Sequence, residues 1–153
     1  MIGNLRGDSV HIAMDLGLAE LDREARFEEN PKFEPGWWQP LHMVSNTLRF
    51  EVRSEGLEVA RVELDESFDL SHYEGAPDLR NRGLEIVFFE VAATRRGRGI
   101  GSRLVAILAS RYPDRRLFAL SEEADGFWSD LGWERFEHPE GTDHWRPLYV
   151  QPI

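Results

Sequence analysis

The stretch LEIVFFEVAATRRGRGIGSRLVAILASRY, residues 84–112, contains three consecutive patterns. Leu84–Val91 is almost continuously apolar and rich in β-branched and aromatic residues, which is typical of a central strand that is buried on both faces. From Ile100 to Tyr112 the apolar residues recur with a helical period. Between them, three alternate glycines beginning at Gly97 allow backbone conformations that a Cβ atom would block. The stretch therefore predicts a buried strand, a tight turn and an amphipathic helix.

The turn is also crowded with cations: Arg95, Arg96, Arg98 and Arg103 lie at the expected start of the helix. Positive charge is disfavoured there by a few tenths to ~1 kcal/mol for each side chain, unless an anion is bound. Exposed amide N–H groups and arginines at one helix end together form a binding site for phosphate. A solvated basic turn is the alternative. The turn matches neither G-x-x-x-x-G-K-[ST] nor G-x-G-x-x-G, the common nucleotide signatures.

Two motifs resemble the GNAT superfamily of acetyl-CoA-dependent N-acetyltransferases. RGRGIG at residues 96–101 is similar to that family's coenzyme signature [Q/R]-x-x-G-x-[G/A]. ADGFWSDLGW at residues 124–133 is similar to its A-x-x-F-Y-x-x-L-G-F segment. The resemblance extends from about Leu84 to Phe136. It implies an α/β fold with a mixed, mostly antiparallel sheet flanked by helices, in which Leu84–Ala92 and Leu117–Leu120 splay apart to admit the pantetheine arm.

The resemblance also implies acetyl-CoA as a cosubstrate, with the backbone N–H of Val91 polarising the thioester carbonyl. Trp128 stands where the family often has a tyrosine that protonates the leaving thiolate, and an indole N–H cannot act as that acid. Ser121 stands where the second motif often carries asparagine. Water or another tyrosine, such as Tyr149, is then the expected proton source. The residues expected at the coenzyme are Val91, Ala92, Ala93, Arg96, Gly97, Arg98, Gly99, Ile100, Gly101, Ser102, Phe127 and Trp128.

Two carboxylates, Glu85 and Glu90, interrupt the apolar strand. Burial raises the pKa of a carboxylate toward neutrality, as a general base requires. In a regular strand, side chains five positions apart face opposite sides, so only one of the two can point at an acceptor. The order Glu85-Ile86-Val87-Phe88 resembles the histone acetyltransferase branch, in which this glutamate activates the amine. Glu85 is therefore the predicted base and Glu90 the reserve; a solvent-exposed carboxylate at the strand entry is the alternative reading of Glu85.

Length and composition favour a globular protein with a substantial core, and we expect residues 1–153 to form one domain. The chain has 41% hydrophobic residues, no cysteine and a net charge of −10, and its histidines show no metal-ligand spacing, so we expect no metal site. Residues 1–80 carry 17 acids and 8 bases, whereas residues 95–116 carry seven arginines against Asp114. This asymmetry suits a cationic acceptor and an anionic cosubstrate, or it serves only solubility. Neither a transmembrane run nor a secretory signal is expected, which favours the cytoplasm.

The remaining chain predicts the order β-α-(α)-β-β-β-α-β-α-β-β. Before the central strand we expect a strand at Val10–Met14, a helix at Asp15–Glu29, a short helix ending at Ser45, and a hairpin of Thr47–Arg53 with Leu57–Leu64. After it we expect a strand at Leu117–Leu120, a helix at Glu122–Leu131 ended by Gly132, and strands at Trp133–Phe136 and His144–Val150. Trp37 and Trp38 either wall an acceptor pocket or cap the core; His72 and Tyr73 offer acid–base chemistry in a polar loop.

The function expected from these observations is transfer of an acetyl group from acetyl-CoA to a primary amine, on a small molecule or on a protein lysine or N-terminus. The alternative is a regulatory or interaction module that binds acyl-CoA without catalysing transfer. We expect an amine acceptor as partner, no membrane and no nucleic acid, because only one basic island is present and the coenzyme would occupy it. A homodimer is an open alternative to a monomer.

Overall fold

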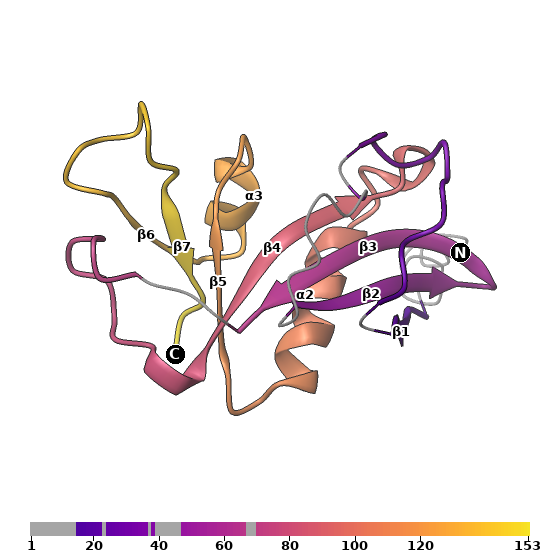
Figure 1. Ribbon diagram of the computed structural model, residues 1–153, viewed down its shortest axis with the longest axis horizontal. Helices are drawn as coiled ribbons and strands as arrows, with labels where there is room; N and C mark the ends of the chain where they lie inside the picture. The colour runs from indigo at the N-terminus through magenta and orange to yellow at the C-terminus, as the bar shows by residue number, and fades with distance from the viewer. Residues whose placement is uncertain (1–14, 23, 37, 39–46, 67–69) are drawn as a thin grey trace, which may run out of the picture.

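The computed structural model describes residues 15–22, 24–36, 38, 47–66 and 70–153. In this part of the chain, one mixed sheet has the strand order β1-β2-β3-β4-β5-β7-β6, and the β4–β5 pair is parallel whereas the other pairs are antiparallel. Figure 1 shows the sheet with its helices. The strands are β1 Gly17–Glu20, β2 Thr47–Ser54, β3 Leu57–Asp65, β4 Gly83–Val91, β5 Arg116–Leu120, β6 Glu134–Phe136 and β7 Leu148–Val150. The α-helices are α2 Ile100–Arg111 and α3 Asp125–Asp130, and short 3₁₀ turns span Arg80–Arg82 and Ala93–Arg95.

The β2–β3 hairpin confirms the prediction made from alternating apolar residues. Its two-residue turn places Glu55 at φ 53° and Gly56 at φ 79°. Positive φ at both central positions is the arrangement whose twist matches that of the flanking strands. Phe50, Val62 and Leu64 of the hairpin are fully buried, so its apolar face forms part of the core.

Strands β4 and β5 diverge, as the resemblance implied. Gly83–Glu85 pair with Arg116–Phe118, and no pairing follows beyond Glu85 among the described residues. Figure 1 shows the two strands meeting at one end and opening into a V toward the other. The rest of β4 stays paired with β3 alone. One edge of β4 is therefore left without a strand partner along Ile86–Val91.

A β-bulge in β4 corrects the prediction that Glu85 and Glu90 face opposite sides. Ile86 pairs with Leu64 and Phe88 with Glu63, so Val87 is an extra residue. The extra residue shifts the alternation by one, which puts two side chains five positions apart on the same face. Consistently, Glu85 and Glu90 pair with Asp65 and Arg61, which are four positions apart on β3. The apolar run carries no signal for this bulge.

Helix α2 covers the face of β2–β4 that is opposite to the one carrying Glu85 and Glu90 (Figure 1). Its residues Ile100, Leu104, Val105 and Leu108 are buried against the strands, and the helix bounds agree with the predicted period. Helix α3 is shorter than the predicted Glu122–Leu131, and it ends before Gly132, whose φ of 78° suits a residue that stops a helix. A second core cluster joins Tyr73 and Leu79 to β5 and β7.

The predicted helix at Asp15–Glu29 is wrong. Gly17–Glu20 forms the edge strand β1, which pairs antiparallel with β2, and residues 24–29 are irregular. Leu16 and Leu18 pack against the core. The two leucines have the two-residue period of a strand, whereas the helix prediction drew on a loose apolar face that continued to Phe27; pairing with the open edge of β2 decides the outcome. The predicted strand at Val10–Met14 and the short helix ending at Ser45 lie outside the described residues, and β7 begins later than the predicted His144.

None of the helices in the described ranges is long and apolar enough to cross a membrane.

Candidate functional site

The turn between β4 and α2 has the backbone that an anion site requires. Gly97 and Gly99 both have φ 76°, and a Cβ atom at either position would meet no other atom within 4 Å. Glycine is therefore needed there for its conformation and not for space. Gly99 immediately precedes α2, which has neither a side-chain cap nor an acidic residue in its first turn. The first N–H groups of a helix have no partner within it, so those of α2 are available to an anion.

Gly101 has a different role from the other two glycines. A Cβ atom on it would lie 3.1 Å from Cε2 of Phe127 and 3.4 Å from Cε1 of Phe89. The start of α2 is therefore packed closely on two aromatic rings, whose centroids are 5.7 Å apart. Trp128 is 4% exposed and packs on Trp133, with ring centroids 4.7 Å apart. Of the two aromatic residues predicted at the coenzyme, Phe127 thus reaches the turn and Trp128 belongs mainly to the core.

A cavity of about 260 Å³ lies where β4 and β5 diverge. Aromatic and aliphatic side chains make up most of its wall, and Glu122 and Arg146 are charged members. These two side chains form an ion pair, with Arg146 Nη1 3.4 Å from Glu122 Oε2. The cavity is lined by Ile86, Val87, Phe88, Phe89, Ala119, Leu120, Glu122, Ala124, Phe127, Trp128 and Arg146.

The backbone of β4 presents N–H groups on its cavity edge. The amide N–H of Ala92 donates to the carbonyl of Val59 at 2.8 Å, which makes these residues a hydrogen-bonded pair. Such pairs alternate along an antiparallel ladder, so the N–H groups of Phe89 and Val91 point away from β3, toward the gap. Sequence reasoning singled out Val91 and missed Phe89, because the choice depends on the ladder register. Ala92 and Ala93 were also predicted to lie at the coenzyme. Their amide N–H groups instead donate within the protein, to the carbonyls of Val59 and Lys32.

Arg96, the first residue of the glycine motif, turns back onto β4. Its Nε donates to the carbonyl of Val91 at 3.2 Å, and its Nη2 donates to Oε2 of Glu90 at 3.4 Å. Its side chain therefore fastens the turn to the end of the strand. Arg98 and Arg103 are exposed at the turn and at the start of α2.

Glu85 lies at the closed end of the V, on the sheet face opposite α2. Burial above all, and also the charge of Asp65, raise the pKa of its carboxyl to about 7 against the opposing charge of Arg146. A carboxyl with that pKa is both a competent proton acceptor and largely ionised just above neutral pH. Tyr73 lies in the same charged neighbourhood, where burial raises its pKa, and its hydroxyl donates to the carbonyl of Arg146 at 2.7 Å.

Glu90, the reserve base, is fully engaged within the protein. Its Oε1 accepts from the indole N–H of Trp38 at 2.7 Å, and its Oε2 accepts from the amide N–H of Glu34 at 2.7 Å as well as from Arg96. The side chain is 5% exposed. Glu90 thus ties the segment around Trp38 to the glycine turn, and this contact network favours an anchoring role for it.

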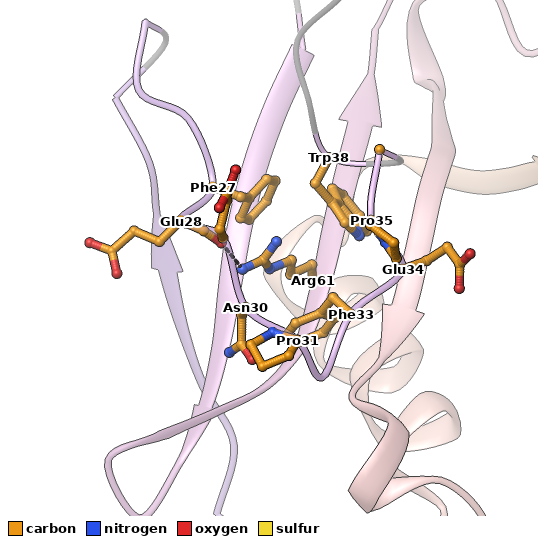
Figure 2. A pocket seen from close by; sticks show the side chains of 11 residues that line it. Phe27, Glu28, Asn30, Pro31, Phe33, Glu34, Pro35, Trp38 and Arg61 are labelled. Carbon is orange, nitrogen blue, oxygen red and sulfur yellow. Dashed lines mark hydrogen bonds between the residues drawn. The ribbon is translucent and has the colours of Figure 1, made fainter.

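A larger cavity, of about 610 Å³, is lined in part by Glu34 and Trp38, the two residues that donate to Glu90 (Figure 2). Phe27, Phe33 and Trp38 supply aromatic walls, and the buried Arg61 forms part of the floor. The Arg61 guanidinium lies 4.9 Å from the ring centroid of Phe27 and 4.3 Å from that of Phe33, and it pairs with Glu58. Trp38 is buried, as expected of a core residue, and it also lines this cavity; Trp37 lies outside the described residues. No sequence pattern indicated the stacked Arg61.

Replacing Glu85 by glutamine is expected to stabilise the protein at high pH. The folded pKa of about 7 exceeds the ordinary 4.5. The folded state therefore binds more protons between these values, and the free energy of unfolding falls as the pH rises through this window. Glutamine carries no charge that must be ionised in a buried position. Glu85→Gln should therefore raise the free energy of unfolding at pH 8 by up to about 3 kcal/mol, and hardly at all below pH 4.5. Urea unfolding at both pH values measures this; a gain that is the same at both would contradict it.

Within the described ranges, no group of three or more His, Cys, Asp or Glu side chains is placed to hold a metal ion.

Comparison of the fold with solved structures identifies its class. An acetyltransferase from Thermus thermophilus matches with a TM-score of 0.55 at 16% identity over 71% of this chain and 65% of that chain, just under two thirds of its length. The Bacillus subtilis N-acetyltransferase YlbP, solved with coenzyme A, matches with a TM-score of 0.53 at 21% identity over 68% and 67%. AtaT, solved with acetyl-methionyl-tRNAfMet, matches with a TM-score of 0.60 at 16% identity over 90% and 95%.

The chain therefore has the fold of the GNAT acetyltransferases, which confirms the fold predicted from its two motifs. By sequence, no protein-family model and no curated protein matches it.

Proposed function

We propose that this chain is an acetyl-CoA-dependent N-acetyltransferase that acts on a primary amine, with Glu85 as general base. The observation that carries the proposal is the position of a partly buried carboxyl with a pKa of about 7 at the closed end of the β4–β5 cleft. The glycine and arginine turn lies at the other end of β4. The proposal thus puts a base and an anion site at the two ends of one strand that lacks a partner on its cleft side.

The binding of the cosubstrate follows from this layout. The N–H groups at the start of α2 and the glycine backbone would hold the pyrophosphate, and the exposed Arg98 and Arg103 would add charge. The pantetheine arm would lie in the cleft and accept a hydrogen bond from the amide N–H of Val91. One neighbour in fold, YlbP, is a coenzyme A complex, which supports this assignment.

Position along β4 favours the N–H of Phe89 over that of Val91 for polarising the thioester carbonyl. Phe89 lines the cavity, and the bulge leaves it roughly 10 Å along the strand from Glu85. Val91 is roughly 17 Å away by the same measure, too far for one carboxylate to serve an amine there. In the proposed site, Phe89 therefore holds the carbonyl oxygen and Val91 binds the arm nearer the pyrophosphate.

In the reaction, a neutral amine forms a C–N bond to the acetyl carbon, the C–S bond breaks, and the amine proton passes to Glu85 directly or through a water molecule. Most amines are cationic at pH 7, so a base is needed. The leaving thiolate takes a proton from water in this scheme. Tyr149 does not line the cavity, so its hydroxyl, which accepts from Arg135 Nη1 at 3.2 Å, is not placed to supply this proton.

A panel of amines offered with acetyl-CoA, with release of free thiol as the readout, tests the proposal. The panel should include alkylamines, diamines, lysine peptides and a methionine-charged initiator tRNA, since AtaT was solved with the acetylated form of such a tRNA. We expect thiol release with at least one amine and little with the tRNA, because residues 1–80 carry a net negative charge. Tight binding of acetyl-CoA without thiol release on any acceptor would favour the acyl-CoA-binding module instead.

A further inference from the structure

The cavity of about 610 Å³ lies on the same face of the sheet as the proposed base (Figure 2). Arg61 of β3 lines it and is the cross-strand partner of Glu90, which shares that face with Glu85. Sites for small organic ligands have volumes of roughly 300–1,000 Å³ and mostly apolar walls. The cavity is therefore large enough for part of a substrate, and it lies on the side of the sheet from which an acceptor would approach Glu85.

The wall of this cavity is aromatic. The rings of Phe27 and Trp38 meet edge to face, with centroids 4.8 Å apart and planes at 72°. Phe33 is a third aromatic wall, and the guanidinium of Arg61 lies 4.3 Å from its centroid and 4.9 Å from that of Phe27. The place that aromatic rings offer to a cation is thus taken by a side chain of the protein itself, so the remaining space suits an uncharged apolar group.

The remaining polar side chains that line the cavity include three exposed acids, Glu28, Glu29 and Glu34. Their charge disfavours an anionic ligand and attracts a molecule that carries an ammonium group outside the cavity. Aromatic walls and an acidic surround together suit an amine that is attached to an apolar ring.

The cavity adjoins the cleft through two aromatic side chains. The rings of Trp38 and Phe88 have centroids 6.0 Å apart, and Phe88 also lines the cavity between β4 and β5. Phe88 is 38% exposed, so it offers an apolar surface between the two spaces. In the β3 ladder, the partner of Phe88 is two residues and Arg61 is four residues from the partner of Glu85, which makes roughly 7 Å and 13 Å.

We propose that the acceptor is a primary amine attached to an aromatic ring by a flexible chain, with the ring in this cavity, the chain over Phe88 and the amine at Glu85. This inference rests on the proposed function. The ring and the amine are then separated by roughly 7–13 Å, the distance between the base and the cavity along the strand. Phe27, Phe33 and Trp38 are the residues that determine specificity, whereas Glu85 performs the proton transfer.

The segment that walls the cavity is also hydrogen-bonded to the end of β4 and to the turn that follows it. The amide N–H of Glu34 and the indole N–H of Trp38 each donate to Glu90 at 2.7 Å. The amide N–H of Ala93 donates to the carbonyl of Lys32 at 2.9 Å. A ring in the cavity and a coenzyme on the turn therefore stabilise the same contacts, and each should increase the affinity for the other by at least ~5-fold.

The kinetic test compares 6-phenylhexylamine with hexylamine, and 2-phenylethylamine with ethylamine. In the wild type, the ring of the long amine should raise kcat/KM at least ~10-fold, because it is buried in the cavity. The ring of the short amine should raise it little, since it cannot reach the cavity while its amine is at Glu85. Phe33→Leu should reduce the preference for the long phenylalkylamine by roughly fivefold or more, mainly through KM.

Phe136→Leu is the matched control, because it makes the same substitution in β6, within the other core cluster. It should keep the preference for the ring, and Phe27→Leu repeats the test if Phe33→Leu does not fold. A ring that helps the short amine as much as the long one, or an unchanged preference in a folded Phe33→Leu protein, would overturn the inference while leaving acetyl transfer intact. A preference for octanoyl-CoA over acetyl-CoA that Phe33→Leu removes would assign the cavity to an acyl chain and would also overturn it.

Calorimetry with 6-phenylhexylamine supplies a readout that does not depend on turnover. The amine should bind more tightly in the presence of coenzyme A, and Phe33→Leu should weaken its binding in both conditions. Equal binding of 6-phenylhexylamine and hexylamine would contradict the inference. Binding of the ring as expected, without acetylation of this or any other amine of the panel, would count against the proposed function and so against the role of the ring in an acceptor.

Discussion

Glu85→Gln is expected to reduce acetyl transfer by ~10²–10⁴-fold, because it removes the general base while preserving the size of the side chain. Affinity for coenzyme A should hardly change, since Glu85 lies at the closed end of the cleft and the anion site lies at the glycine turn. Single-turnover transfer and equilibrium binding of coenzyme A measure the two effects separately. The same variant should be more stable than the wild type at pH 8, a combination that distinguishes a functional carboxylate from one that supports the fold.

The control for this experiment is Glu63→Gln, which removes a carboxylate from the same sheet face without touching the proposed base. Full activity of Glu85→Gln would refute the assignment. If Glu90→Gln were inactive at the chemical step and Glu85→Gln were not, the base would be Glu90. The hydrogen bonds of Glu90 to Trp38 and Glu34 lead us to expect lower stability of Glu90→Gln instead.

Gly99→Val should weaken the binding of coenzyme A by at least ~100-fold. At φ 76° a β-branched residue is strained by roughly 1–3 kcal/mol, so the backbone is expected to leave this conformation and to turn the first N–H groups of α2 away from the phosphates. Isothermal calorimetry with coenzyme A measures the loss. The 3′-dephospho form, which should bind the wild type more weakly at low salt, shows how much of the affinity depends on the arginines.

Gly141→Val is a matched control for backbone strain. Gly141 has φ 86° and open space around its Cα, like Gly99, but it lies in the loop between β6 and β7. It should cost similar stability and leave coenzyme affinity unchanged. Unchanged affinity in a folded Gly99→Val protein would remove the glycine turn from the binding site.

Local pattern was sufficient to predict much of this fold. The apolar run from Leu84, the glycine turn and the amphipathic helix from Ile100 each have a period or a composition that depends on few distant contacts, and all three are present. The hairpin of β2 and β3 was predictable for the same reason. By contrast, the loose apolar pattern from Leu16 to Phe27 predicted a helix, and pairing with the free edge of β2 makes Gly17–Glu20 a strand instead.

The details of the candidate site depend on register, which the sequence does not show. The bulge at Val87 places Glu85 and Glu90 on one face, and it also brings Phe89 within reach of Glu85. The roles of the two glutamates differ because Glu90 meets Trp38 and Glu34, more than fifty residues earlier in the chain. The position of Asp65 directly opposite Glu85, where its charge raises the pKa of Glu85, follows from the same register.

The most direct test of the central claim is the pH dependence of kcat at saturating amine and acetyl-CoA. The base acts as the carboxylate, so activity should be present above its pKa and lost as the pH falls through it. We predict that kcat of the wild type rises through a midpoint near pH 7, the pKa that burial and Asp65 give Glu85, and that this step is missing in Glu85→Gln. A flat profile between about pH 5.5 and 8.5, or the same midpoint in both proteins, would contradict the claim that Glu85 is the base.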